Sequence, residues 1–129
     1  MEKVGTKGRR IKFFSRKNNC VMCVHSREQK IFADILETDL NVKSYEVMKE
    51  LEVNRYSRVN PINIRKEYFQ IAWSSDFVIH YIDGKVAVRE LVHSGSIFKR
   101  ATIEKAEFSR RYWASMKVKD WKLILTGGN

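Results

Sequence analysis

The chain has 129 residues, of which 43% are hydrophobic, and it carries a formal net charge of +10 at pH 7. This length is typical of one globular domain with a proper core, and the basic charge favours an anionic partner such as nucleic acid. The apolar runs are too short to span a bilayer and the basic N-terminus has no hydrophobic signal core, so we expect a cytoplasmic protein without a membrane partner.

Residues 1–19 are predicted to form a flexible basic arm ahead of a single domain at residues 20–129. The arm holds seven basic residues against one acid, Glu2, and so contributes +6 of the total charge. Such segments bind DNA phosphates through counterion release, although solvated basic tails are also common. The residues expected to contact DNA are Lys7, Arg9, Arg10, Lys12, Arg16 and Lys17.

Cys20 and Cys23 have the spacing of a zinc knuckle, and His25 follows closely. A structural zinc ion needs four ligands, and the sequence offers no second pair at a suitable spacing. The apolar residues between the cysteines instead favour a strand at 20–24, in which two reduced cysteines act as small apolar side chains.

A helix is predicted to begin at Ser26, because Ser26 and Gln29 have the spacing of a capping box. The apolar residues that follow at helical spacing are Ile31, Phe32, Ile35, Leu36 and Leu40. Glu28 lies three and four residues before Ile31 and Phe32, so we expect it on the core-facing stripe of this helix. A simpler account is that an acid in the first turn is favoured by the helix dipole.

Residues 41–45 predict a further strand, whereas residues 46–70 mix basic and aromatic side chains without a clear period. This mixture suits a DNA-facing surface, and it is equally typical of half-exposed strands. Both interpretations stay open.

The strongest local signal is a β-hairpin formed by residues 75–81 and 86–92 around an Asp83-Gly84 turn. Each of the two apolar strands contains one carboxylate, Asp76 in the first and Glu90 in the second. A carboxylate is costly to bury unless it is paired, protonated or bound to a metal. The pair therefore suggests a site for a divalent cation.

The turn decides whether Asp76 and Glu90 share a face of the sheet. A two-residue Asp83-Gly84 loop would turn Glu90 to the opposite face from Asp76 and exclude the site. A three-residue loop of 83–85, with Gly84 in a left-handed conformation, would make the acids diagonal neighbours on one face, roughly 7–8 Å apart. The metal hypothesis requires this second register.

Towards the C-terminus, Thr102 is predicted to cap a second helix that runs to about Met116, and residues 121–126 read as a final strand. Trp113 and Trp121 are more typical of core aromatics than of base-stacking groups.

This order of elements resembles the PD-(D/E)xK nucleases, and specifically the N-terminal catalytic domain of TnsA, the endonuclease subunit of heteromeric bacterial transposases. The matching stretches are 26–28, 41–45, 75–81 with the Asp83-Gly84 turn, the Glu90 strand, 107–113 and 120–124. The resemblance implies an α/β, restriction-endonuclease-like core with a mixed central sheet flanked by helices. It also implies that Glu28, Asp76 and Glu90 bind one or two Mg²⁺ or Mn²⁺ ions, which activate water and stabilise the charge on a scissile phosphate.

The lysine of the family's third motif corresponds to Val92 in this chain. Valine cannot donate a hydrogen bond to the nucleophile or to the phosphate. The lysine could have migrated to the following loop and helix, where Lys99, Arg100 and Lys105 are available; the substitution could be tolerated; or cutting could be lost. We rank migration first, with Lys99 and Lys105 as catalytic candidates, because long basic side chains reach several ångströms.

We therefore expect a metal-dependent DNA endonuclease of phage or mobile-element type in a bacterial or phage-infected cell. Its expected partners are DNA and other transposition or phage proteins, and a homodimer is an open alternative. The alternative from a different class is a non-catalytic DNA-binding or assembly subunit on the same fold, which Val92 supports. An RNA-binding domain ranks third, because it leaves the acids unexplained.

Overall fold

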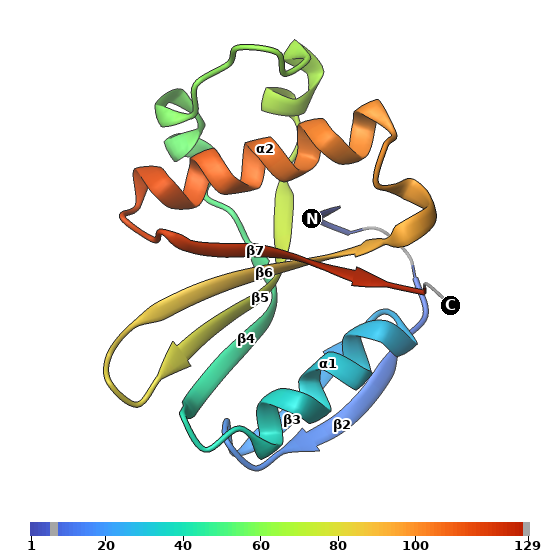
Figure 1. The fold of residues 1–129 in the computed structure, drawn as a ribbon, viewed down its shortest axis with the longest axis vertical. Coiled ribbons are helices and arrows are strands. Elements are labelled where there is room, and N and C mark those ends of the chain that lie inside the picture. The colour runs from blue at the N-terminus through green and yellow to red at the C-terminus, as the bar shows by residue number, and fades with distance from the viewer. Residues whose placement is uncertain (6–7, 128–129) are drawn as a thin grey trace.

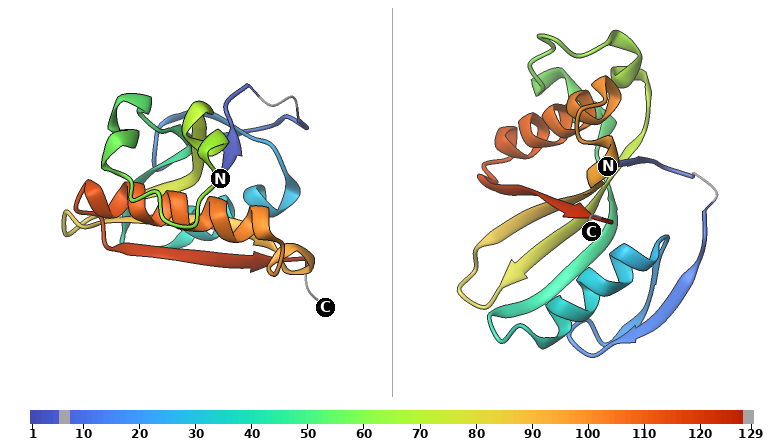
Figure 2. Two further views of the ribbon diagram at one scale, coloured as in Figure 1. Left: turned by 90° about the horizontal axis from the view of Figure 1, so that it is seen from above. Right: turned by 45° about the vertical axis from the view of Figure 1, so that its right-hand side comes forward.

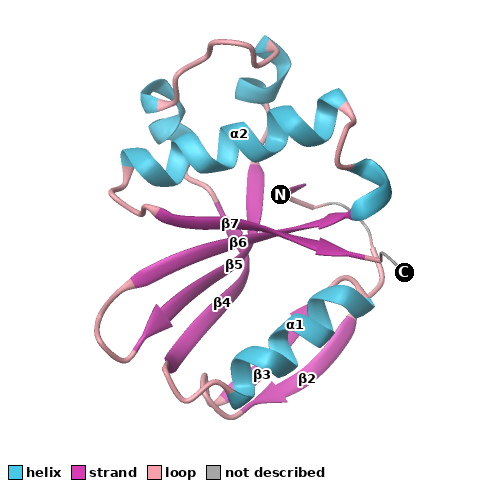
Figure 3. Ribbon diagram, viewed as in Figure 1, coloured by secondary structure: helices cyan, strands magenta, loops and turns pink. Residues whose placement is uncertain are grey.

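A five-stranded mixed sheet forms the centre of the structure, a computed structural model that describes residues 1–5 and 8–127 (Figure 1). Its strands are β1 (Glu2–Lys3), β4 (Val42–Glu50), β5 (Trp73–Tyr81), β6 (Val86–His93) and β7 (Asp120–Thr126). β5 is antiparallel to β1, β4 and β6, whereas β7 is parallel to β6. The predicted α/β class with a mixed sheet and flanking helices is confirmed at this level (Figure 3).

The sheet lies between two layers, which Figure 2 shows from two further directions. One layer contains α1 (Arg27–Thr38) and a separate antiparallel hairpin of β2 (Ile11–Ser15) and β3 (Cys20–Val24). The other contains α2 (Arg100–Ser115) and the short 3-10 helices η1 (Val53–Arg58) and η2 (Lys66–Gln70). A third 3-10 turn, η3 (Ser94–Ser96), connects β6 to α2.

The alternation of side chains along β5 builds a core on each face of the sheet. Phe77 and Ile79 pack with Leu36 of α1, while Val78 packs with Phe108 of α2. All four hydrophobic residues named from β5 and α2 are at most 2% exposed. The two cores hold α1 and α2 in fixed positions on opposite faces of the sheet. Side chains of either helix can therefore contact specific residues of the strands.

The hairpin loop differs from both predicted registers. The backbone N–H of Tyr81 donates to the carbonyl of Lys85 at 2.9 Å, so the loop consists of Ile82, Asp83 and Gly84. Gly84 has φ +87°, the left-handed conformation that the last position of such a loop requires. The loop has the predicted length and glycine geometry, but it starts one residue earlier than expected.

This shift places Asp76 and Glu90 on the same face in a register that neither prediction contained. The last β5–β6 pair is Phe77 with Arg89. Continued by one residue, this register puts Asp76 directly opposite Glu90 rather than diagonal to it. The two strands separate at this point.

Ser26 caps α1 as predicted, because its hydroxyl accepts the N–H of Gln29 at 3.1 Å. The predicted core-facing stripe of the helix is confirmed only for Phe32 and Leu36, which pack in the core. The buried residues are Gln29, Ala33 and Leu36, whereas Ile31 and Ile35 are more than half exposed. Since each helical residue turns by about 100°, Glu28 faces away from the line on which Gln29 lies.

The second helix begins at Arg100 with Lys99 as its N-cap, three residues before the cap predicted at Thr102. It ends at Ser115, close to the predicted end. Trp113 is buried as predicted, and its indole N–H donates to Ser75 Oγ at 2.8 Å.

The prediction of a flexible arm at residues 1–19 differs from the structure. β1 pairs with β5, with Glu2 opposite Ser74, and β2 pairs with β3 over five residue pairs. Apolar side chains in β2, such as Phe13, pack against the core and give this segment a reason to fold. Among the described residues, no helix is long and apolar enough to cross a membrane.

Candidate active site

The acids Asp76 and Glu90 bridge the gap where β5 and β6 separate. The N–H of Asp76 donates to Glu90 Oε1 at 2.9 Å, and the N–H of Leu91 donates to Asp76 Oδ2 at 2.8 Å. Asp76 is 3% exposed and Glu90 is 1% exposed. Both carboxylates thus accept backbone hydrogen bonds that carbonyl groups would accept in a continuous β-ladder. As a result, two buried carboxylates lie close together.

A cation lies between these carboxylates. The ammonium group of Met1 is 3.1 Å from Glu90 Oε1 and 3.5 Å from Asp76 Oδ2. Burial disfavours the charged amine, but the charges of Glu90 and Asp76 outweigh it and raise the pKa of the Met1 amino group to about 10. The amine is therefore protonated at neutral pH.

Burial also raises the pKa of the Asp76 carboxyl to about 6, even though the Met1 ammonium lowers it. A carboxylate without water around it is stabilised mainly by nearby positive charge. The space between the two acids is therefore a position that favours a cation.

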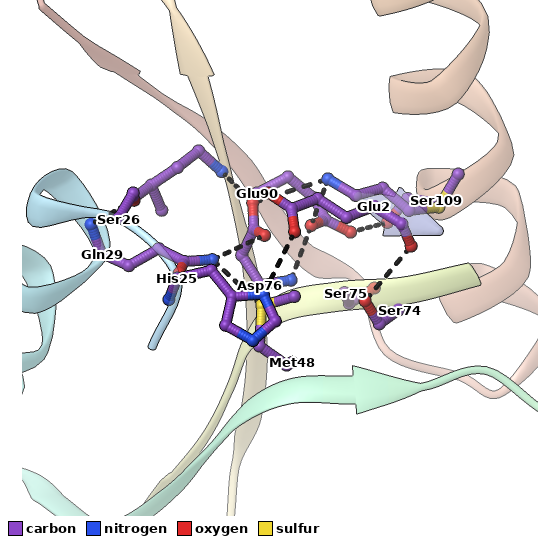
Figure 4. Close-up of polar contacts among 12 residues, drawn as sticks. Glu2, His25, Ser26, Gln29, Met48, Ser74, Ser75, Asp76, Glu90 and Ser109 are labelled. Atoms are coloured by element: carbon purple, nitrogen blue, oxygen red, sulfur yellow. Dashed lines mark hydrogen bonds and ion pairs between the residues drawn. The ribbon is translucent and has the colours of Figure 1, made fainter. Parts of the chain in front are cut away.

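Gln29 of α1, rather than Glu28, reaches the acid pair (Figure 4). Its amide nitrogen donates to Asp76 Oδ1 at 3.2 Å and contacts Met48 Sδ at 3.1 Å, while its amide oxygen accepts the N–H of His25 at 2.7 Å. Met48 has φ +50° within β4, an unusual conformation for a side chain of this size. A strained strand residue and the first turn of α1 thus border the site.

Glu90 is held from the other side by α2. Ser109 Oγ donates a short hydrogen bond to Glu90 Oε2, and Trp121 Nε1 donates to Ser109 Oγ at 2.9 Å. Ser109 is fully buried. These contacts leave Glu90 a single defined orientation towards Asp76.

Glu28 lies apart from the acid pair. It lines an apolar groove of 280 Å³ between α1 and β7, together with Ile31, Ile35 and Leu125. Within the described part of the chain, no three His, Cys, Asp or Glu side chains are grouped so that they could hold a metal ion. The predicted convergence of three carboxylates is therefore wrong, because the helix presents the neighbouring Gln29 to the sheet.

Lys105 and Lys99 occupy different places. Lys105 lines a cavity of 180 Å³ that Glu90, Val92 and Met1 also line, and its Nζ lies 5.6 Å from the centre of the Trp73 ring. Lys99 is the exposed N-cap of α2 and does not line this cavity. The structure thus brings Lys105, and not Lys99, near the acid pair.

The basic residues expected to bind DNA also separate into groups. Arg9, Arg10, Lys12 and Arg16 are exposed, as DNA contacts require. Lys17 is used within the protein: its ammonium donates to the carbonyls of Asp39 and Val42 at 2.8 and 2.6 Å. Lys7 lies outside the described residues.

Three groups of the site were missed in the sequence: Gln29, Ser109 and the Met1 amine. Gln29 was recognised only as part of a capping box, although its position next to Glu28 could have suggested it as the residue facing the sheet. No local pattern distinguishes Ser109 or Met1, because their roles depend on contacts across 19 and 75 residues or more.

The arrangement provides two buried carboxylates, a cation between them and a lysine in the adjoining cavity. Oxygen donors of this kind suit a hard divalent cation. No protein-family model matches the chain, and no curated protein matches its sequence.

Proposed function

We propose that the protein is a metal-dependent DNA endonuclease with a restriction-endonuclease-like core, similar to the TnsA-type transposase nucleases. The observation that carries this proposal is the buried pair of Asp76 and Glu90, with a cation between their oxygens at the point where two strands separate. Burying two acids in one place is unfavourable for folding, and such unfavourable arrangements are concentrated at functional sites.

The two carboxylates offer oxygen donors of the kind that Mg²⁺ and Mn²⁺ prefer. Asp76 and Glu90 would hold the ion through their carboxylate oxygens, and the Met1 ammonium marks the position as one that accepts positive charge. A bound divalent ion would activate a water molecule and neutralise charge on the scissile phosphate. Gln29 would keep Asp76 in place through its amide nitrogen.

Lys105 would supply the positive charge that the family motif places at Val92. It lines the same cavity as Glu90, on the helix that also positions Glu90 through Ser109. A lysine in this cavity can donate to a phosphate oxygen or to the attacking water. The net charge of +10 would attract the DNA backbone to the protein.

A non-catalytic DNA-binding or assembly subunit is the second candidate. Val92 at the lysine position and neutral Gln29 in place of a third acid favour it. The two candidates make opposite predictions for cleavage, while both predict binding to DNA.

Incubating plasmid DNA with the purified protein in Mg²⁺ or Mn²⁺, with EDTA as control, tests the proposal. We expect cleavage by the wild type and its loss in Asp76→Asn and Glu90→Gln, with DNA affinity unchanged or higher because a negative charge is removed near the phosphate. Glu67→Gln, which changes an exposed acid, is the matched control and should cut normally.

Cleavage by Asp76→Asn at the wild-type rate would show that the acid pair is not the active site. If the wild type never cuts and Val92→Lys restores cutting, the protein is a degenerate nuclease and the assembly role replaces the endonuclease.

A further inference from the structure

The segment Met1–Val4 closes the gap between β5 and β6. Ser74 of β5 pairs with Glu50 of β4 on one side and with Glu2 on the other, so β1 takes the edge of β5 that β6 has left. The side chain of Met1 is buried in the core beside α2. The ammonium of this segment contacts both Asp76 and Glu90, which are almost inaccessible to solvent.

The backbone pairing of the segment with the sheet is short. β1 has two residue pairs with β5, compared with seven between β4 and β5. Further contacts include the Val4 N–H to the Ala72 carbonyl at 2.8 Å, Ser74 Oγ to the Glu2 carbonyl at 3.2 Å, and an ion pair of Glu2 with His25 at 3.7 Å. Short, edge-bound elements of this kind open at a lower free-energy cost than the strands of a core.

The Met1 ammonium and a divalent ion cannot occupy the acid pair together. The ammonium lies within 3.5 Å of both carboxylates, in the position through which they would hold a metal. The ammonium and a metal ion bound there would repel each other, and both would need the same carboxylate oxygens. A phosphate likewise cannot approach carboxylates that are 3% and 1% exposed.

We propose that Met1–Val4 is a displaceable strap that competes with the divalent cation and the phosphate for the Asp76–Glu90 pair, which rests on the proposed endonuclease function. When the strap is closed, the Met1 ammonium occupies the site. Metal binding shifts the equilibrium between closed and open strap towards the open state. The apparent metal affinity is then the intrinsic affinity reduced by the fraction of open molecules.

A reversible cross-link tests the strap. Glu2→Cys and Ser74→Cys place two thiols at directly paired positions of antiparallel strands, where the separation of Cα atoms suits a disulfide. The native Cys20 and Cys23 are replaced by serine so that only one bridge can form. The oxidised protein has a locked strap, and the same protein after reduction is its matched control.

The readout is Mn²⁺ binding by titration calorimetry, without DNA. We expect the oxidised form to bind Mn²⁺ at least tenfold more weakly than the reduced form, and Asp76→Asn in the reduced form to lose binding. Equal Mn²⁺ affinity in both redox forms overturns the strap while leaving the endonuclease proposal in place. An absence of Mn²⁺ binding in both forms overturns the strap and the proposed metal site together.

Hydrogen exchange in the unmodified protein gives an independent measurement. Saturation with Mn²⁺ should speed exchange of the Val4 amide, whose hydrogen bond to Ala72 is lost when the strap leaves, while amides in β4 and β5 keep their protection. If Mn²⁺ binds and the Val4 amide exchanges more slowly than before, the segment is part of the metal site and not its competitor.

Discussion

Asp76 and Glu90 hold two separating strands together through their side chains: the Asp76 N–H donates to Glu90 Oε1, and the next residue after Glu90 donates to Asp76 Oδ2. Each carboxylate therefore serves as an acceptor in the sheet and still directs oxygen towards the cation between them. This double use ties the geometry of the acids to the backbone. A small change in strand separation would move both acids relative to each other.

Lys105 should be separable from Lys99 in cleavage assays. If Lys105 contacts the phosphate or the attacking water, Lys105→Ala should lower the cleavage rate by about 10²–10³-fold with little change in DNA affinity. Lys99→Ala should cut at nearly the wild-type rate, because Lys99 does not line the cavity beside Glu90. Equal losses in the two variants would contradict the assignment. Thermal melting of both variants checks that a slower cleavage by Lys105→Ala is not caused by the lost packing of Lys105 on Trp73.

Gln29→Glu should make the stability of the folded protein depend more strongly on bound metal. The new carboxylate would lie where the amide now donates to Asp76 at 3.2 Å, so without metal it adds a buried negative charge and should cost roughly 3 kcal/mol of unfolding free energy. Mn²⁺ should raise the melting temperature of Gln29→Glu more than that of the wild type. Glu28→Gln is the control, since Glu28 lies in the groove beside β7 and should leave the Mn²⁺ response unchanged.

Glu37 should stabilise the protein in a pH-dependent way. Its carboxylate accepts hydrogen bonds from Ser15 and Tyr45, both at 2.6 Å, and so fastens the β2–β3 hairpin and β4 to α1. Although burial alone would raise the pKa of Glu37, these hydrogen bonds lower it below its usual 4.5. The stabilisation is therefore present above pH 4.5 and lost as the pH falls through the lower pKa of the folded state.

Glu37→Gln should accordingly lower the unfolding free energy by about 1–3 kcal/mol at pH 7, measured by urea denaturation. The difference from the wild type should shrink as the pH is lowered below 4.5. Glu67→Gln serves as the control with no expected effect, and a difference for Glu37→Gln that grows on acidification would refute the role of the charged form.

Substitutions of the exposed basic residues should change the salt dependence of DNA binding, whereas substitution of Lys17 should not. Arg9→Ala or Arg10→Ala should each reduce the slope of log affinity against log salt by up to about 0.9, as for the loss of one phosphate contact. Lys17→Ala should leave the slope unchanged and lower the melting temperature, because its ammonium binds the carbonyls of Asp39 and Val42. A slope that does not change in any of the three variants would mean that this segment does not touch DNA.

The sequence by itself determined the local elements of this protein. The hairpin at Asp83-Gly84, the cap at Ser26 and the strand at the cysteines depend on turn chemistry, capping and apolar spacing within a few residues. The apolar character of β5 and β6 also identified Asp76 and Glu90 as acids in buried strands. These features are local, so short-range rules are sufficient to find them.

Tertiary structure decided what surrounds the acids. The hairpin loop begins one residue earlier than the predicted three-residue loop, so that Asp76 comes opposite Glu90 instead of Val92. α1 buries the side that carries Gln29, Ala33 and Leu36, which brings Gln29 to Asp76 and leaves Glu28 outside. The Met1 ammonium reaches Asp76 across 75 residues of sequence, and only the folded sheet, by leaving a gap beside β5, brings these two charges together.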